Sequence, residues 1–257
     1  MHIAFIDKIL LIFFHELQNY FTLAARTFVR LFRRPFYYRE FAIQFDKLGF
    51  ASLFICTLTG LFSGMVMALQ SLIQLKPFAA TSYVGGMVAV TMIKELGPVL
   101  ASLMVAGRVG SAITAELGTM VVTEQVDAMR VEGTDVIKRL VTPRLKAMII
   151  ALPLLTIVTD VVSILGGYIM SAGYNINPVM YISGLPQFML FQDLVEGVVK
   201  PAVFGVIIAV TACYVGLNTR GGAAGVGAAA KQAVVLSSVL ILVCDFFIAK
   251  IFVVFRG

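Results

Sequence analysis

The chain has no tryptophan, only two histidines and three cysteines among its 257 residues, and just 13% of its residues are charged. Because both histidines, His2 and His15, precede the first long apolar run, a hydrolytic site with a histidine base or a histidine-ligated metal is not expected. The cysteines lie singly inside apolar runs, which also disfavours a disulfide framework and a zinc site. The motifs GxxxxGK(S/T), GxGxxG, HExxH and GxSxG do not occur. If the protein performs work, the energy must therefore come from an ion gradient or from a partner.

Apolar residues, by contrast, make up 60% of the chain, and its mean hydropathy is +0.95. A water-soluble domain of this size could not bury so much apolar surface, which excludes a soluble enzyme, a disordered tail and a collagen-like fibre. We therefore expect an all-α integral membrane protein that forms one domain. About 20 apolar residues cross the roughly 30 Å of hydrocarbon in a bilayer. Five runs are long enough, at about 48–75, 81–106, 145–172, 195–217 and 232–255.

The N-terminal segment, residues 1–40, has a different pattern. Polar residues recur at every third or fourth position, as in His15, Asn19, Thr22 and Arg26, while aromatic residues occupy other positions. This spacing predicts an amphipathic helix. Aromatic side chains on one side and arginines on the other suit a helix in the membrane–water interface, where the arginines meet anionic headgroups. A helix that binds a partner outside the membrane is the alternative.

Lysine and arginine are distributed unevenly between the two sides of the membrane that the five spans define. Fifteen of the 20 lie in residues 1–47, in residues 108–146 or in residues 220–231, and these three stretches share one side. Three more lie within spans, and the opposite side receives only Lys76 and Arg256. By the positive-inside rule, the N-terminus is cytoplasmic and the C-terminus lies outside. Topology therefore explains the net charge of +6, and no nucleic-acid partner is expected.

The cytoplasmic segment between the second and third spans, residues 116–143, has a weak helical pattern. Apolar residues four and three positions apart predict a short amphipathic helix: Val122, Val126 and Met129. Gly133 can end this helix in a left-handed conformation, and Asp135 can cap the next one. Such a helix can lie on the membrane or dock in a groove on a partner, and its mixed charge slightly favours a partner; a solvated connector fits the pattern equally well.

Ionisable residues also occur within the spans, where each would cost about 3 kcal/mol or more if it faced lipid at mid-membrane. Two lysines and two carboxylates lie well within the spans, Lys94, Glu95, Lys200 and Asp245, while Asp160 and Lys250 are weaker candidates. Opposite charges of this kind can neutralise one another in a shared cluster. We interpret them either as a polar site that lines a cavity for a charged or zwitterionic substrate, or as structural pairs that hold helices together.

Small residues at four-residue spacing indicate close contact between helices. Gly60 and Gly64 form GxxxG in the first span, and Gly107 and Ser111 repeat the spacing after the second. This spacing lets two backbones approach, either within the bundle or between two copies of the chain.

The longest distinctive stretch is residues 94–144, KELGPVLASLMVAGRVGSAITAELGTMVVTEQVDAMRVEGTDVIKRLVTPR. It closely resembles the central region of MlaE-type permeases, the membrane subunits of ABC transporters that work with MCE proteins. Residues 63–70, SGMVMALQ, and the last span with Asp245 extend the match. The resemblance covers essentially the whole chain from the first span onward, whereas the N-terminal segment matches only in being amphipathic and basic.

The resemblance implies a fold and a set of partners. The chain, residues 1–257, would form a single permease domain with an interfacial helix and five spans, and it would assemble as a homodimer in the bacterial inner membrane. It would hold no catalytic residue, metal or cofactor, since ATP and Mg would be bound by two cytoplasmic ATPase subunits. These would dock on a coupling segment: Thr123, Glu124, Gln125, Asp127, Met129 and Arg130. A periplasmic MCE-domain hexamer and a small cytoplasmic STAS-domain protein would complete the complex.

The substrate implied by the resemblance is phospholipid, moved between the inner membrane and the MCE channel, with a contribution to outer-membrane lipid asymmetry. The implied substrate-binding residues lie in or just after the first span and in the intramembrane charged set: Met67, Leu75, Phe78, Lys94, Glu95, Lys200 and Asp245. Lys94 stands where relatives can carry Arg, so a compact ammonium replaces a bidentate fork there.

Two other functions fit the residues alone. An ion-coupled secondary carrier would use Glu95 or Asp245 as its proton site. A non-transporting membrane scaffold would anchor an envelope complex.

Overall fold

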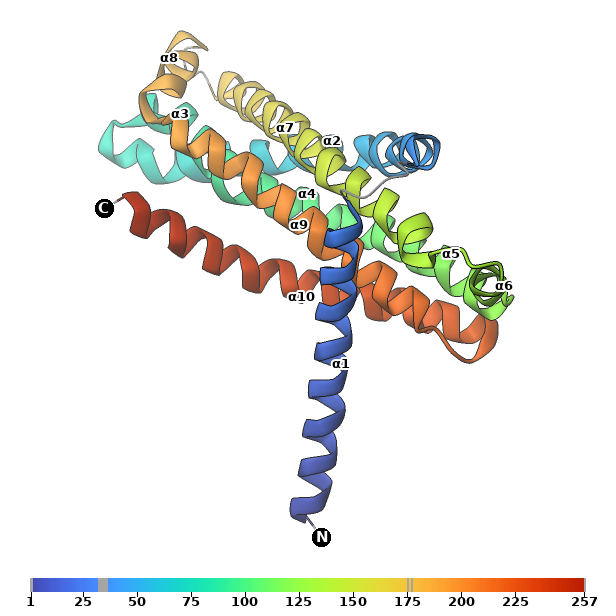
Figure 1. Cartoon of the computed structure of the whole chain (residues 1–257). Coiled ribbons are helices and arrows are strands. Elements are labelled where there is room, and N and C mark those ends of the chain that lie inside the picture. The colour runs from blue at the N-terminus through green and yellow to red at the C-terminus, as the bar shows by residue number, and fades with distance from the viewer. Residues whose placement is uncertain (1, 32–36, 175, 177, 257) are drawn as a thin grey trace.

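Figure 1 shows the computed structural model of the chain, in which residues 2–31, 37–174, 176 and 178–256 are described. The described residues form helices joined by short turns, and no strand occurs among them. Five helical segments are long and apolar enough to cross a membrane: Tyr38–Phe78, Thr81–Val122, Ile137–Gly173, Phe191–Leu217 and Gly222–Val254. The prediction of an all-α membrane protein with five spans is confirmed.

The spans differ in how many helical pieces they contain. The first comprises α2 (Tyr38–Leu75) and η1 (Lys76–Phe78). The second comprises η2 (Thr81–Tyr83), α3 (Val84–Thr91), η3 (Met92–Leu96), α4 (Gly97–Val105), η4 (Ala106–Gly110) and α5 (Ser111–Val122). The third comprises η5 (Ile137–Val141) and α7 (Thr142–Gly173), the fourth is α9 (Phe191–Leu217) and the fifth is α10 (Gly222–Arg256). Outside the spans lie α1 (His2–Leu31), α6 (Gln125–Val131) and α8 (Pro178–Phe188).

Two helices extend well beyond the predicted spans. The second span is predicted to end near residue 106, but helix continues through α5 to Val122 and stops only where Glu124 adopts a φ of 59°. The fifth is predicted to begin at 232, but α10 starts directly after a glycine pair, Gly221 and Gly222, with φ of 89° and 66°. A drop in hydropathy marks where the hydrocarbon ends, whereas a helix ends where the backbone conformation changes. Both helices are therefore longer than the predicted runs, whose limits within the membrane stay a prediction.

α1 runs across the bundle of spans rather than along it, and its N-terminal part extends away from the rest of the chain (Figure 1). Its C-terminal half contacts the bundle, where the Tyr20 hydroxyl lies 3.1 Å from the Thr211 hydroxyl of α9. Phe14 and Phe21 remain exposed. The predicted amphipathic helix is confirmed for residues 2–31, and its direction relative to the spans is that of a helix lying along a membrane surface. Residues 32–36 of the predicted segment lie outside the described residues.

α2 and α7 pack together through small residues. A Cβ added at Gly60 would lie 2.7 Å from the Thr159 carbonyl oxygen, and one at Gly64 would overlap with the backbone of Ser163. The two backbones therefore touch, which confirms the predicted contact for this GxxxG pair. At Gly107, by contrast, an added Cβ would meet nothing within 4 Å in this chain.

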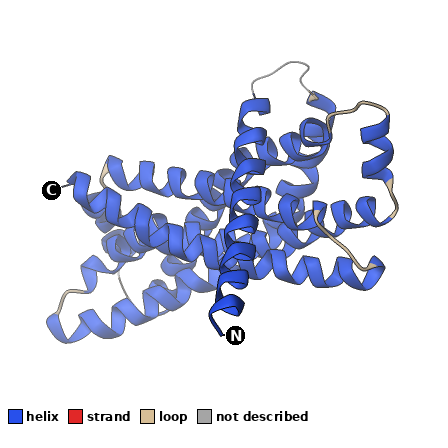
Figure 2. Cartoon of the chain, turned by 60° about the horizontal axis from the view of Figure 1, so that its bottom comes forward, coloured by secondary structure: helices blue, strands red, loops and turns tan. Residues whose placement is uncertain are grey.

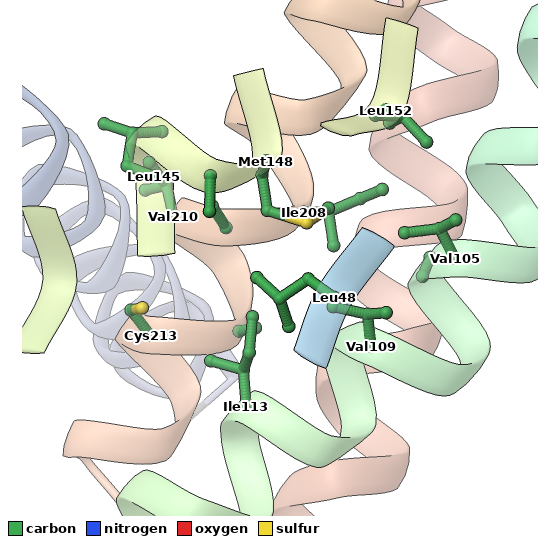
Figure 3. Close-up of a cluster of buried hydrophobic side chains, with 14 of the residues drawn as sticks. Leu48, Val105, Val109, Ile113, Leu145, Met148, Leu152, Ile208, Val210 and Cys213 are labelled. Carbon is green, nitrogen blue, oxygen red and sulfur yellow. The ribbon is translucent and has the colours of Figure 1, made fainter. Parts of the chain in front are cut away.

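The main apolar core lies where the second, third and fourth spans cross, with α2 along one side (Figure 3). Figure 3 labels residues from α2, α4, η4, α5, α7 and α9: Leu48, Val105, Val109, Ile113, Leu145, Met148, Leu152, Ile208, Val210 and Cys213. Because lipid tails are as apolar as these side chains, the core holds by close packing rather than by exclusion of water. This rigid crossing is the scaffold for the polar groups described below.

α8 lies at the end of the bundle opposite α6, where it packs on α3 (Figure 1). A Cβ at Gly86 would lie 2.7 Å from the Gly184 carbonyl oxygen, and the rings of Tyr83 and Phe188 pack edge to face with centroids 5.5 Å apart. Figure 2 shows that the connections between helices are short and gather at the ends of the bundle. The polar groups within the spans are therefore held by helices and not by loops.

Candidate substrate site and coupling surface

The second span departs from a regular α-helix at the position of Lys94 and Glu95. These residues belong to η3, a π-helical turn, which is followed by Gly97 and Pro98. Proline lacks a backbone N–H, so Pro98 leaves the carbonyl of Lys94, four residues earlier, without its α-helical donor. Single π turns within helices are frequent at functional sites.

Lys200 of α9 supplies the missing donor and is the centre of a charged cluster. Its side chain is fully buried, and its Nζ donates to the Lys94 carbonyl oxygen at 3.0 Å. The same ammonium donates to Glu95 Oε2 at 2.7 Å. It also lies 3.1 Å from Glu196 Oε1 and 3.1 Å from Asp245 Oδ1 of α10. Lys200 thus contacts the other three predicted intramembrane residues, and the four residues come from the second, fourth and fifth spans.

The Lys94 side chain has different partners from its backbone. Its Nζ lies 3.5 Å from Asp193 Oδ1 and 4.0 Å from Glu196 Oε2. Both carboxylates are buried near the start of α9, where Asp193 also accepts a hydrogen bond from the backbone N–H of Leu190 at 2.9 Å. Sequence reasoning did not assign these two carboxylates to the site. A signal was present, since Glu196 precedes Lys200 by four residues and so shares its helix face.

Two glycines let the charged helices approach one another. A Cβ at Gly197 would lie 2.7 Å from the carbonyl oxygen of Ile93, so α9 crosses η3 in backbone contact. A Cβ at Gly97 would overlap with the carboxylate of Asp160 on α7. Because Gly197 lies less than one turn before Lys200, a side chain at Gly197 would push the lysine away from the second span.

The cluster contains four carboxylates and only two ammonium groups, and its members are unequally accessible. Lys200 and Glu196 are closed off, whereas the side chains of Glu95 and Asp245 are 40% and 19% exposed. The accessible carboxylates can accept hydrogen bonds from a cationic or hydroxylated group, and the Lys94 ammonium, 19% exposed, can donate to an oxyanion. Chemically, this is a polar site within an apolar bundle that can both accept and donate hydrogen bonds.

The predicted apolar residues at the end of the first span are placed in two ways. Met67 and Leu75 are half-buried and pack against an apolar cluster that includes Met92, the first residue of η3. This cluster therefore adjoins the turn that carries the charges. Phe78 lies in η1 and is 79% exposed, so the single chain does not bury it.

The predicted coupling segment forms a turn and the short helix α6. Val126 is 2% exposed and Met129 packs against the main core, so the apolar face of α6 is directed at its own chain. Intrachain packing therefore already uses Val126 and Met129, while Val122 is exposed, and docking of this segment on a partner stays a prediction. A partner would instead meet the polar side and the preceding turn, which are exposed: Thr123, Glu124, Gln125, Asp127 and Arg130.

Two ion pairs at this end of the bundle lie at the surface. Arg130 donates to Asp127 at 2.8 Å within α6. Arg30 of α1 donates through Nε to Asp135 Oδ2 at 2.5 Å, and the Lys138 backbone N–H donates to Asp135 Oδ1 at 3.2 Å, which confirms the predicted helix cap. Partial burial raises the pKa of Asp135, but the hydrogen bond from Arg30, the backbone donors and the Arg30 charge together hold this pKa below its usual value.

Gly133 ends the stretch after α6 as predicted, with a φ of 75°. The chain can therefore turn directly from α6 into η5 and the third span. This turn keeps the coupling segment short and held against the bundle.

A multi-pass helical chain with a charged cluster inside its spans and an exposed polar helix at one end has the organisation of a membrane transport subunit. Comparison with protein families agrees with this class: the model described as Permease MlaE matches residues 41–251. The chain belongs to the MlaE permease family, as its resemblance to that family predicts.

Its relatives are named as transport proteins. The chain is 44% identical over 233 residues to a probable ABC transporter permease protein of Rickettsia bellii, covering 90% of this chain and 89% of that one. It is 37% identical over 247 residues to a probable ABC transporter permease protein of Synechocystis, covering 96% and 93%. It is 32% identical over 210 residues to the intermembrane phospholipid transport system permease protein MlaE of Haemophilus influenzae, covering 81% and 80%. The chain is thus an ABC permease, a membrane subunit that works with an ATPase partner.

Proposed function

We propose that this permease moves phospholipids between the inner membrane and a periplasmic MCE protein, and so contributes to outer-membrane lipid asymmetry. The observation that carries the proposal is the charged cluster around Lys200, which lies within the spans and is accessible at Glu95 and Asp245. The name of the Haemophilus relative, an intermembrane phospholipid transport permease, supports lipid as the cargo.

In this proposal, the charged cluster binds the headgroup of the lipid and the adjoining apolar residues contact its acyl chains. Lys94 donates to the phosphate, while Glu95 and Asp245 accept hydrogen bonds from the remainder of the headgroup. Met67 and Leu75 line the path of the acyl chains, and Phe78 extends that path at the surface. Only a few polar groups are needed to orient such a ligand, because apolar contacts supply most of its buried area.

The complete site requires a second copy of the chain in this proposal. α10 leaves much of its apolar surface exposed, as at Val239, Leu242 and Phe246. In a homodimer, exposed faces of this kind would enclose the lipid between the two copies. A periplasmic MCE hexamer would lie at the end with α8, while the ATPases and a STAS-domain protein would lie at the cytoplasmic end with α6. The N-terminus would be cytoplasmic and the C-terminus periplasmic, as the excess of lysine and arginine indicates.

Coupling would run along the second span. α6 follows α5 after a two-residue turn, and α5 is continuous through η4 and α4 with η3, which holds Lys94 and Glu95. A displacement of α6 by closing ATPases would therefore reach the cluster through one chain of helical segments. The two π turns in this path, η3 and η4, are the places where its backbone hydrogen bonding is least regular.

The polar side of α6 provides the test. Exchanging the two charges of its ion pair, Asp127→Arg with Arg130→Asp, preserves an intrachain pair but inverts the charges presented to a partner. We expect the permease to remain folded while co-purification with its co-expressed ATPase and ATP-dependent lipid transfer are lost. Glu132→Gln, at the end of the same helix, is the matched control and should retain both.

If the exchanged variant still binds the ATPase and transfers lipid, the coupling assignment is wrong. Lipid transfer driven by a pH gradient without any ATPase would instead support an ion-coupled carrier. Normal lipid transfer in the presence of an inactive permease that still assembles would support a non-transporting scaffold.

A further inference from the structure

One carboxylate within the spans takes no part in the charged cluster. Asp160 of α7 is 7% exposed, and its Oδ1 has no hydrogen-bond partner among the described residues. It is also absent from the ion pairs that the described residues form. Buried polar atoms are normally hydrogen-bonded and buried charges are normally paired. The isolation of Asp160 therefore needs a physical explanation.

The helices that surround this part of α7 bring no charge to Asp160. α7 has no other charged residue between Lys146 and Gly173, α2 has none between Lys47 and Lys76, and α3, α4 and α8 have none at all. The charged residues of η3 and α9 belong to the cluster around Lys200. None of the described charges comes close enough to act on the Asp160 carboxyl, so burial is the one influence on it.

Asp160 faces the π turn of the second span. A Cβ added at Gly97 would overlap with Asp160 Oδ1 and would lie 2.8 Å from the carbonyl oxygen of Met92, so the two oxygens flank the same point. The Met92 carbonyl accepts the backbone N–H of Gly97, but a carbonyl oxygen has two lone pairs and can accept a second hydrogen bond. Two acceptors beside each other repel unless a proton on one of them supplies a donor.

We propose that Asp160 is a proton-binding site, held as a neutral carboxylic acid whose O–H donates to the Met92 carbonyl oxygen. The proton removes a charge that hydrocarbon cannot solvate, and it supplies the donor that both oxygens lack. The bond ties α7 to the first residue of η3, so Asp160 is a positioning residue for the turn that carries Lys94 and Glu95. This inference does not depend on the transport function proposed above, because no lipid takes part in it.

The proton also keeps Asp160 from competing for the ammonium groups of the cluster. That cluster already contains four carboxylates for two lysines, and an ionised Asp160 would add a fifth beside the turn that holds Lys94. With Asp160 neutral, the Lys94 ammonium stays beside Asp193, at 3.5 Å, and Lys200 stays among its own three carboxylates. The neutral acid thus holds η3 in place without disturbing the balance of charge.

Infrared spectroscopy tests the protonation directly, because the C=O stretch of a carboxylic acid is separate from the bands of a carboxylate. The full chain is produced with a heavy carbon isotope in the side-chain carboxyl group of aspartate and is purified at neutral pH in a maltoside detergent, which has no carbonyl group. We expect a carboxylic-acid band that shifts with the label and is lost in Asp160→Asn. Asp46→Asn, on an exposed part of α2, is the matched control and should keep the band.

Two variants of similar size separate the hydrogen bond from the packing. Asp160→Asn keeps the shape of the side chain and an N–H donor, so its unfolding temperature should stay close to that of the wild type. Asp160→Leu fills a similar space without a donor, and we expect its unfolding temperature to fall by about 3 °C. Rescue by asparagine is expected only if the side chain acts as a neutral donor.

A labelled acid band that is unchanged in Asp160→Asn would overturn the proposal, because the Asp160 carboxyl would then be ionised. Loss of the same band in Asp46→Asn would also overturn it, since the signal would not belong to Asp160. An asparagine variant that unfolds as early as the leucine variant, or that does not fold, would show that the donor has no role. If only the leucine variant fails to fold, loss of the band in the folded asparagine variant still supports the proposal.

Discussion

The charged cluster and α6 both contain pairs of opposite charge, yet the two regions are built on opposite principles. Around Lys200 the pairs share one fully buried ammonium between three spans, and Lys200 and Glu196 depend on the cluster for their solvation. On α6 the Asp127–Arg130 pair is exposed, with apolar side chains on the inner face of the helix. A buried charge that loses its partner costs several kcal/mol, whereas an exposed pair contributes well under 1 kcal/mol. The cluster therefore stabilises the fold as well as forming the candidate site. The exposed residues of α6 can be substituted with little loss of stability.

Removing the central cation should have the largest effect. Lys200→Met leaves the carboxylates of Glu95, Glu196 and Asp245 without their shared ammonium, and we expect stability to fall by about 3–5 kcal/mol. Thermal unfolding in detergent would measure the loss. Lys250→Met, near the end of α10, is the control and should unfold near the wild-type temperature. Equal unfolding of the two variants would mean that the cluster does not brace the spans.

Separating α9 from η3 should have the next largest effect. Gly197→Ala places a methyl group against the Ile93 carbonyl oxygen, and overpacking of this kind costs about 1–3 kcal/mol. Gly227→Ala, where an added Cβ meets nothing within 4 Å, should be neutral. The difference in unfolding temperature between the two variants measures how tightly the cluster depends on helix approach. No difference would show that η3 and α9 can move apart without cost.

Neutralising the most accessible carboxylate should separate binding from stability. Glu95→Gln keeps the shape of the side chain and can still accept a hydrogen bond from Lys200, so the unfolding temperature should change little. We expect lipid binding to the reconstituted permease to weaken by about tenfold, because the charged acceptor for the headgroup is lost. Lipid retained after purification, quantified by mass spectrometry, provides the measurement. Loss of folding with unchanged lipid content in the folded fraction would favour a purely structural cluster.

Acid should weaken the link between α1 and η5, and this is the smallest expected effect. The pKa of Asp135 in the folded chain lies below its usual value of about 3.9. The ionised carboxylate therefore stabilises the folded chain at pH values above about 3.9. This contribution is lost as the pH falls from there through the lowered pKa of the folded chain. The unfolding temperatures of wild type and Asp135→Asn should therefore differ at pH 6 and converge toward pH 3. A difference that persists at pH 3 would mean that the carboxylate charge is not the cause. Because the pair is exposed, we expect a modest difference even at pH 6.

Sequence patterns predicted which segments are helical better than they predicted the residues at which the helices end. Hydropathy identified five spans, and Gly60 with Gly64 correctly marked the contact with α7. Hydropathy could not show that helix continues past residue 106 to Val122, since it falls where polar residues begin, whether or not the helix goes on. The backbone conformation of Glu124 decides the end, and a positive φ at glutamate has no strong sequence signal.

The candidate site was predictable in part. The cost of intramembrane charge singled out Lys94, Glu95, Lys200 and Asp245, and the structure brings all four together. The burial of Asp193 and Glu196 was not predicted, because both lie close to the beginning of the predicted span, where a carboxylate can equally reach water. For α6, the pattern showed an apolar face but not whether the chain itself or a partner covers it.

The sequence by itself determined that the chain spans a membrane five times and that a few charges within the spans must meet one another, because hydrocarbon gives neither an isolated charge nor an unpaired backbone group any other partner. Only the tertiary structure decided which charges meet. The missing N–H of Pro98, the bare backbone of Gly197 and the length of the Lys200 side chain act together across two helices, and no local pattern records how those helices cross.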